Sequence, residues 1–410
     1  MSLSVVRFLR SPASLAVAGR GVQYATQLAL VLIVPKVLMP EAYVQFSLVM
    51  PLAFLGMTLV YDWLAGSMFR HVHELLSASD TRFRQTVTFY YGVTAILLVL
   101  GYFVASFYVD SIYHLVPLIL LAAALKAGIL RILNGAERYG FFLVANFGFA
   151  VSLVIFLLMC WRGKQENIAQ FLLIYALIDI VLALVFWKVA GVFIFSPRPD
   201  FDKAVVKRYL RYGIPLVMNN IAVWVISMSD RYMLAFWETP THVADYILSY
   251  QLSGSVITIP MAFVMAVVFP KAIRVDRDEG EDAALKYIYG VLGLYLRYMA
   301  LILILACTIV IPFKFYFYPE YEFNPLIIVI IVLAHVIYGL SQFYNKEFEL
   351  NGRTLVITRG IGLGGFLNIA LNLLLIPVWG GVGAAIATLV AYCVSVYYVR
   401  SARSYKFSTT

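Results

Sequence analysis

Residues 372–388 read NLLLIPVWGGVGAAIAT, a run without any charged side chain. The run joins two apolar segments, near 354–376 and 381–399, and each is long enough to cross the roughly 30 Å hydrocarbon core of a bilayer as a helix. The composition of the whole chain agrees, because it is 62% hydrophobic and 13% charged, with a mean hydropathy of +0.87. An ordinary soluble domain is about 25% charged. The sequence therefore predicts an integral membrane protein.

Further apolar segments of this kind precede the pair. They lie near 12–34, 43–69, 85–109, 113–133, 141–160, 169–191, 213–237, 245–270, 287–312 and 326–345. The longest polar interval, 196–211, carries five cations and divides the chain nearly in half. We therefore expect an all-α fold of twelve transmembrane helices. An N-terminal six-helix bundle would span 1–195, a cytoplasmic basic linker 196–211, and a C-terminal six-helix bundle with a short cytoplasmic tail 212–410.

The two halves resemble each other in register. Pro12 and Pro215 are 203 residues apart, and so are Tyr43 and Tyr246. Because each half has an even number of helices, both halves would start on the same side of the membrane. The two bundles would then be related by a pseudo-two-fold axis along the membrane normal, with the substrate path between them.

The distribution of Lys and Arg predicts the orientation in the membrane. The tails and loops on one side hold 21 of these residues, and the loops on the other side hold 4. Cytoplasmic loops are the cation-rich ones, so both termini and the linker are expected in the cytoplasm. The net charge of +9 is then mostly a signal of topology, and no nucleic-acid partner is expected.

Six cations interrupt otherwise apolar segments, namely Arg20, Lys126, Lys188, Arg231, Arg297 and Arg359. A charge at the centre of a bilayer costs at least about 2.5 to 3.5 kcal/mol, so these side chains must face protein, water or an anionic cargo. We expect Lys188 to extend to the lipid headgroups. Arg359 lies near the predicted cytoplasmic end of its helix, where both an interfacial and a luminal position remain open.

Uncharged polar residues accompany the deeper cations. Arg20, Gln23 and Gln27 follow i, i+3, i+7 spacing, which predicts one polar face on an otherwise apolar helix. We expect such faces to line a water-filled lumen between the bundles. The predicted luminal residues are Arg20, Gln23, Gln27, Lys126, Asn220, Arg231, Arg297, Asn368 and Asn372.

The acids within the predicted spans are fewer, namely Asp62, Asp179 and Asp230. The resulting positive balance favours an anionic cargo. Asp62 or Asp179 could couple transport to a proton gradient, or could be a fixed counter-ion for Arg20, Lys126 or Arg297. We favour the counter-ion, because nothing in the sequence marks either acid as titrating near neutral pH.

Three stretches together resemble a known family. They are PKVLMPEAY at 35–43, SDRYML at 229–234 with VADY at 243–246, and the opening run at 372–388. In order and spacing they are similar to the polysaccharide-transport branch of the multidrug/oligosaccharidyl-lipid/polysaccharide exporter superfamily, and specifically to the Wzx-type O-antigen flippases. The family more often has Gly where Val44 and Asp245 stand, which leaves local turn details open.

The resemblance implies a MATE-like pair of bundles around a cavity that opens alternately to the two sides. It implies an oligosaccharide repeat unit on undecaprenyl pyrophosphate as substrate, and a role in O-antigen, lipopolysaccharide or related polysaccharide biosynthesis. It also implies a multi-pass protein of the bacterial cytoplasmic (inner) membrane. A polysaccharide polymerase and a chain-length regulator would be possible membrane partners.

The short loops on the cation-poor side argue against an enzyme, and no cofactor or metal is expected. Two other functions remain open. A MATE-like multidrug or cation antiporter is the nearer alternative, although the excess of intramembrane cations is against it. A membrane glycan polymerase is the second.

Overall fold

The structure, a computed structural model, describes residues 12–77, 81–109, 111–163, 168–192 and 203–403. Within these residues the fold is helical and has no strand. The chain divides into two compact units, 1–221 and 222–410, which are described separately below. Ten helices of the described residues are long and apolar enough to cross a membrane, so the chain is a multi-pass membrane protein.

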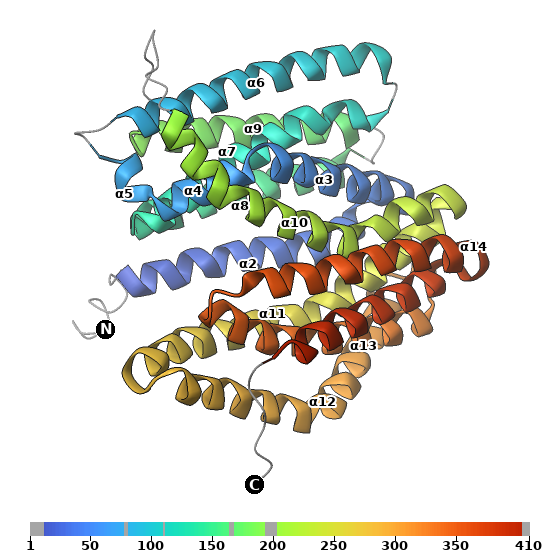
Figure 1. The fold of residues 1–410 in the computed structure, drawn as a ribbon. Coiled ribbons are helices and arrows are strands. Elements are labelled where there is room, and N and C mark those ends of the chain that lie inside the picture. The colour runs from blue at the N-terminus through green and yellow to red at the C-terminus, as the bar shows by residue number, and fades with distance from the viewer. Residues whose placement is uncertain (1–11, 78–80, 110, 164–167, 193–202, 404–410) are drawn as a thin grey trace, which may run out of the picture. The chain divides into compact units, whose positions relative to one another are not determined.

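Unit 1 is built around one apolar helix. Its elements are α2 (Pro12–Val37), α3 (Pro40–Val60), α4 (Asp62–Arg70), α5 (Val72–Leu75), α6 (Arg82–Tyr108), η1 (Ile112–Leu115), α7 (Val116–Gly135), α8 (Tyr139–Arg162), α9 (Ile168–Val189) and the start of α10 (Lys203–Trp237). Helix α7 packs against α3, α4, α6, α8 and α9 (Figure 1). The buried Trp187 of α9 donates a hydrogen bond to the Leu125 carbonyl of α7 over 2.8 Å.

The second predicted span, 43–69, is not one helix. Helix α3 ends at Val60 and α4 begins at Asp62. The Val60 carbonyl accepts hydrogen bonds from Trp63 Nε1 at 2.9 Å and from the Tyr90 hydroxyl at 2.6 Å. A membrane helix can break only where protein groups satisfy the freed backbone, and these two side chains do so here.

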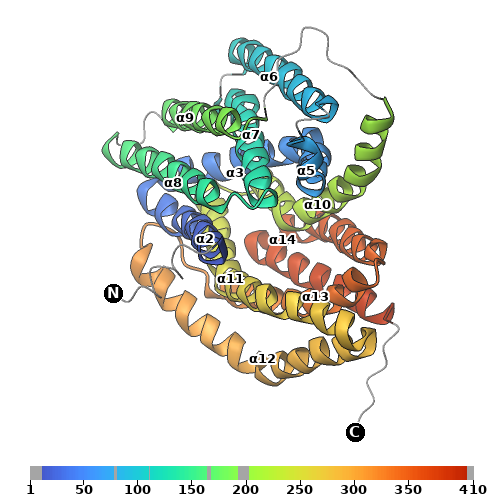
Figure 2. The ribbon, with the colours of Figure 1, turned by 90° about the vertical axis from the view of Figure 1, so that its left-hand side faces the viewer.

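Unit 2 comprises the rest of α10 with four long helices. They are α11 (Pro240–Glu279), α12 (Glu281–Phe317), α13 (Pro325–Leu350) and α14 (Thr354–Ser401). Helix α13 packs against α11, α12 and α14 (Figure 2). Helix α14 doubles back at Gly380, whose φ of 52° and ψ of −131° interrupt the helix. The sequence predicts two segments, 354–376 and 381–399, on either side of this bend.

The predicted linker, 196–211, has two parts in the structure. Its first residues lie outside the described residues, and from Lys203 onward it forms the beginning of α10. The two compact units divide at Ile221, within the same helix. The domain bounds 1–195 and 212–410 therefore stay a prediction.

Gly380→Ala is expected to destabilise unit 2 by about 1 to 3 kcal/mol, because a side chain is strained at this backbone conformation. A Cβ atom there would also meet the Glu238 carboxylate. Thermal unfolding of the purified protein in detergent measures the loss. Gly362→Ala, in the same helix with no heavy atom within 4 Å of its Cβ position, is the matched control and should be neutral or stabilising. Equal melting temperatures for the two variants would contradict this account of the bend.

Candidate functional site

Helices α2, α3, α7, α8 and α9 of unit 1 enclose a cavity of about 260 Å³. Most of its lining is apolar. Its polar groups are Gln23, Thr26, Gln27, Lys126, Asn146 and Asp179. Two predicted luminal glutamines and one predicted luminal lysine therefore line one cavity, together with one of the predicted acids.

Lys126 and Asp179 form an ion pair across this cavity. The Nζ atom of Lys126 lies 3.0 Å from Asp179 Oδ2, and it also lies 4.6 Å from the centre of the Phe149 ring. The second carboxylate oxygen of Asp179 is buried and has no hydrogen-bond partner among the described residues. The pair gives Asp179 one of the partners considered for it from the sequence, and the counter-ion role stays a prediction.

Asp179→Asn is expected to destabilise the protein by about 1 to 3 kcal/mol. The change leaves the Lys126 ammonium beside a neutral amide. The cost is below the value of a fully buried pair because the Lys126 side chain is 25% exposed. Thermal unfolding measures it, and the double variant Lys126→Gln/Asp179→Asn should recover most of the loss. Additive losses in the two single variants and the double variant would show that the pair does not act as a unit.

Asp62 has a different partner from those expected. Its carboxylate lies 2.8 Å from Arg131 Nη1 and accepts hydrogen bonds from Asn220 Nδ2 at 3.1 Å and Thr58 Oγ1 at 3.2 Å. Arg131 thus takes the place for which Arg20, Lys126 or Arg297 was expected. Asn220, which was predicted to line the lumen, is thus a hydrogen-bond donor to Asp62 in unit 1.

Arg131 is one of the 21 cations assigned above to the tails and loops of the cation-rich side, and the structure corrects this assignment. Arg131 lies in α7, four residues before the helix ends at Gly135. Its position inside the predicted segment 113–133 was the available signal. A cation that close to the end of an apolar segment can be assigned to either the loop or the helix from sequence alone.

In unit 2, Asp230 and Arg231 of α10 are both buried. Asp230 accepts hydrogen bonds from the Tyr246 hydroxyl and from the Arg231 backbone amide, the latter at 2.9 Å. The Arg231 guanidinium lies 5.6 Å from the centre of the Tyr250 ring. Its Nε atom has no hydrogen-bond partner among the described residues.

Asn368 and Asn372 do not lie where the sequence analysis expected them. Both are fully buried in α14. Asn372 Nδ2 donates to Asn368 Oδ1 at 2.9 Å, and Ser229 Oγ of α10 lies 3.4 Å from the same oxygen. Amides in membrane helices commonly bond to neighbouring helices in this way. The prediction that these amides line an open lumen is therefore corrected, because they are used in helix packing.

The remaining intramembrane cations are exposed, namely Arg20, Lys188, Arg297 and Arg359. Among the described residues none of the four has an acidic partner within 4.0 Å. Beside Arg297, Gly290 and Gly293 of α12 have no heavy atom within 4 Å of a Cβ position. Arg20 and Arg297 are thus the predicted luminal cations that are free to contact something outside their own helices.

The sequence analysis missed a buried histidine in unit 2. His335 of α13 has Nδ1 at 2.9 Å from the Ile331 carbonyl. It lines a cavity of about 200 Å³ together with Tyr250, Tyr338 and Tyr392. An ionisable residue within the apolar segment 326–345 was the signal that could have marked it.

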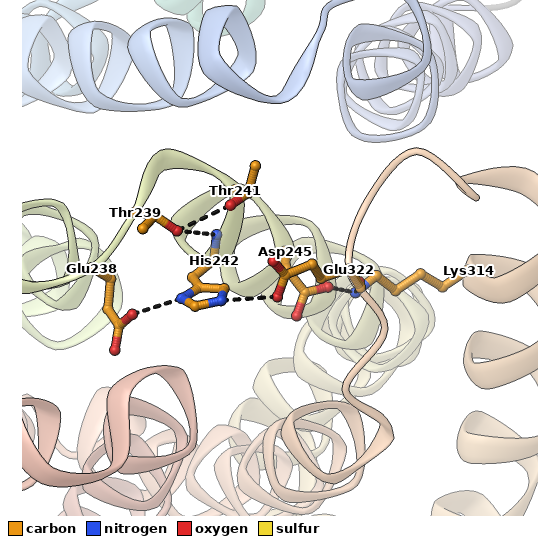
Figure 3. Close-up of polar contacts among 7 residues, drawn as sticks. All are labelled: Glu238, Thr239, Thr241, His242, Asp245, Lys314 and Glu322. Atoms are coloured by element: carbon orange, nitrogen blue, oxygen red, sulfur yellow. Dashed lines mark hydrogen bonds and ion pairs between the residues drawn. The ribbon is translucent and has the colours of Figure 1, made fainter.

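A polar cluster joins helix ends in unit 2 (Figure 3). The Lys314 ammonium of α12 binds the Asp245 carboxylate of α11, Ser249 Oγ at 2.8 Å and the Glu322 carbonyl at 3.0 Å. Lys314 is 1% exposed and Asp245 is 3% exposed. Lys314 is one of the four cations assigned above to the loops of the cation-poor side, and this assignment is wrong because its side chain is buried at the end of α12. Asp245, where the family more often has Gly, thereby has a partner.

His242 lies between two carboxylates in the same cluster. Its Nδ1 is 2.8 Å from Glu238 Oε2, and its Nε2 is 3.1 Å from Glu322 Oε2 (Figure 3). Both ring nitrogens can donate only when the imidazole is protonated. The cluster ties the end of α10 and the start of α11 to the segment between α12 and α13.

Comparison with solved structures places the fold. The structure is similar to the lipid II flippase MurJ in its inward closed conformation, with a TM-score of 0.69 and 14% identity over 94% of this chain and 86% of that chain. It is also similar to an inward-facing multidrug resistance MATE family transporter of the MOP superfamily, with a TM-score of 0.66 and 13% identity over 94% and 97% of the two chains. At these identities the likeness shows the fold alone.

A curated sequence relative is the probable low-salt glycan biosynthesis flippase Agl15 of Haloferax volcanii. It is 22% identical over 244 residues, which cover 57% of this chain and 50% of the relative. The chain spans about half the length of the curated relatives it matches. The activities of those whole proteins therefore enter only as proposals.

The family itself is shown by a model that matches more than half of the chain. The model is that of the polysaccharide biosynthesis proteins, and it matches residues 12–275. This range includes the stretches 35–43 and 229–234 on which the resemblance was based, and the match confirms that resemblance. The chain belongs to the polysaccharide biosynthesis protein family, within the fold shared by MATE transporters and MurJ.

Proposed function

We propose that the chain moves undecaprenyl-pyrophosphate-linked oligosaccharide repeat units from the cytoplasmic to the periplasmic leaflet. The charged head and glycan would cross through a cationic lumen by alternating access while the lipid chain stays in the bilayer. O-antigen, lipopolysaccharide or a related polysaccharide would be the product of the pathway. The similarity of the chain to the lipid II flippase MurJ and to the probable glycan biosynthesis flippase Agl15 supports this choice.

The observation that carries the proposal is how the intramembrane charges pair. Asp62 forms an ion pair with Arg131, and Asp179 forms an ion pair with Lys126. Among the described residues, Arg20 and Arg297 are then left exposed without an acidic partner within 4.0 Å. An exposed cation at membrane depth is stabilised by an anion, and pyrophosphate is an anionic group that a lipid-linked glycan brings to that depth.

We assign the luminal residues accordingly. Arg20 and Arg297 would contact the anionic head, with Gln23 and Gln27 offering hydrogen bonds to sugar hydroxyls. Arg359 would act at the cytoplasmic end. Asp62 and Asp179 would act as fixed counter-ions. Lys126, paired with Asp179, and Arg231, buried beside Asp230, would then support the walls of their units without adding free charge.

The proposed topology has twelve spans. The ten apolar helices become twelve when α14 is counted as two around Gly380 and α10 is added. Six spans would then precede the linker and six would follow it, related by an axis along the membrane normal. Both termini and the linker would lie in the cytoplasm of a bacterium, with the protein in its inner membrane.

Reconstitution tests the proposal directly. Proteoliposomes that carry a fluorescent glycan on undecaprenyl pyrophosphate are treated with an impermeant glycosidase after increasing times. The protein should make inner-leaflet substrate accessible at a rate well above that of empty vesicles. No acceleration, or transport of cationic dyes instead, would overturn the proposal, and the second result would favour the antiporter. Incorporation of labelled sugar into polymer would favour the polymerase.

A further inference from the structure

An apolar groove of about 430 Å³ lies between α11 and α12 of unit 2. Its lining is almost wholly hydrophobic, and includes Val264, Leu294, Ile302, Leu305, Ile309 and Phe343. Along α12 the lining runs from Val291 to Ile309, which is roughly 27 Å at 1.5 Å per residue. This length is close to the roughly 30 Å hydrocarbon core of a bilayer. The groove thus has the dimensions for a chain that lies along the helix.

The wall of the groove is held by packing. The Tyr295 hydroxyl, which belongs to the lining, donates to the Val336 carbonyl of α13 over 2.7 Å. On α11 the lining includes Pro260, which lies inside the helix. The hydrogen bond holds α12 against α13, the helix that contributes Phe343 to the lining.

A cation of α12 lies next in sequence to a lining residue, although it is not itself part of the lining. Arg297 is exposed and directly precedes Tyr298, a lining residue. One and two turns away on its own face, Gly293 and Gly290 have no heavy atom within 4 Å of a Cβ position. An apolar groove beside a cation and bare backbone is complementary to a long apolar chain that ends in a phosphate.

The depth of Arg297 in the membrane distinguishes two ligands of this kind, an ordinary phospholipid and a lipid whose phosphate crosses the bilayer. It lies ten residues from the start of the apolar segment 287–312, or about 15 Å into the membrane. The phosphate of an ordinary phospholipid stays at the headgroup level, near the ends of such a helix. A lipid whose phosphate is in transit across the bilayer passes the level of Arg297.

We propose that the α11–α12 groove holds the lipid chain of the substrate, and that Arg297 contacts its first phosphate. The inference rests on the proposed flippase function and adds a place for the part of the substrate that does not enter the lumen. The ligand class is a polyprenyl phosphate, and phosphatidylglycerol is the competing occupant that the test must separate from it.

The test uses the full chain in nanodiscs with a photoreactive polyprenyl phosphate and maps the labelled peptides by mass spectrometry. Peptides of α11 and α12 should be labelled, and unlabelled polyprenyl phosphate should compete while an equal excess of phosphatidylglycerol should not. Leu305→Trp, which fills the groove, should lower labelling about tenfold, equivalent to about 1.4 kcal/mol. Its neighbour Ile304→Trp, equally exposed but outside the lining, should stay within about twofold.

The variant Arg297→Gln distinguishes binding of the phosphate from binding of the apolar chain. It should weaken competition by polyprenyl phosphate about tenfold and leave competition by uncharged polyprenol unchanged. Equal competition by phosphatidylglycerol, or equal labelling of the Leu305→Trp and Ile304→Trp variants, would overturn the inference. If the wild type flips glycan lipids and the groove is not labelled, this inference fails and the proposed function stands. If the groove is labelled and no flipping occurs, the proposed function fails alone.

Discussion

Replacing Arg20 and Arg297 together by alanine should lower the rate of glycan-lipid flipping by about a hundredfold. A hydrogen bond between charged groups contributes about 1.5 to 3 kcal/mol, and 1.4 kcal/mol is a factor of ten. Each single variant should therefore lose about tenfold. The two losses should multiply if each cation, Arg20 on α2 and Arg297 on α12, makes its own bond to the anionic head. The proteoliposome assay measures all three variants at equal protein amount.

The control for this experiment is Lys188→Ala. Lys188 is also an exposed cation in an apolar helix, but it lies near the predicted interface and should lose less than about twofold. Arg20→Lys and Arg297→Lys retain the charge but lose the planar guanidinium, which can bind a phosphate through two hydrogen bonds. Their flipping rates should lie between those of the wild type and the alanine variants. An unchanged flipping rate in the double alanine variant would contradict the hypothesis that Arg20 and Arg297 contact the substrate in the lumen.

The charge pattern could be read from the sequence only in part. The sequence identifies which apolar segments carry a charge, because that depends on composition alone. It does not identify pairs, because Lys126 and Asp179 are 53 residues apart and Asp62 and Arg131 are brought together by the packing of α4 on α7. Asn368 and Asn372 show the same limit, since i, i+4 spacing of amides fits a luminal face and a buried helix contact equally well.

The helices themselves were largely predictable, because long apolar segments in a membrane must be helical to satisfy their backbone groups. The observed bounds of α6, α8 and α9 lie within a few residues of the predicted segments. The break at Tyr61 could not be predicted, since the segment 43–69 is apolar on both sides of Asp62 and the break depends on distant donors such as Tyr90. The extent of α10 into the basic linker was missed because cationic residues extend a helix beyond the membrane without changing its hydropathy signal.

Removing one member of the Lys314–Asp245 pair should cost about 3 to 5 kcal/mol, the largest stability effect expected in this chain. Both side chains are almost fully buried. Asp245→Ala leaves a buried ammonium with two neutral acceptors, Ser249 Oγ and the Glu322 carbonyl, and Lys314→Met leaves a buried carboxylate. Each change leaves an uncompensated charge in an environment of low dielectric constant.

The double variant Asp245→Ala/Lys314→Met should lie within about 1 kcal/mol of wild type, because replacing a buried ion pair by apolar residues is often neutral. Thermal unfolding in detergent of the four proteins gives the coupling energy of the pair. Additive losses would mean that the contact between α11 and α12 is not energetically coupled. Recovery in the double variant would instead show that the buried acid is tolerated because Lys314 reaches it from α12.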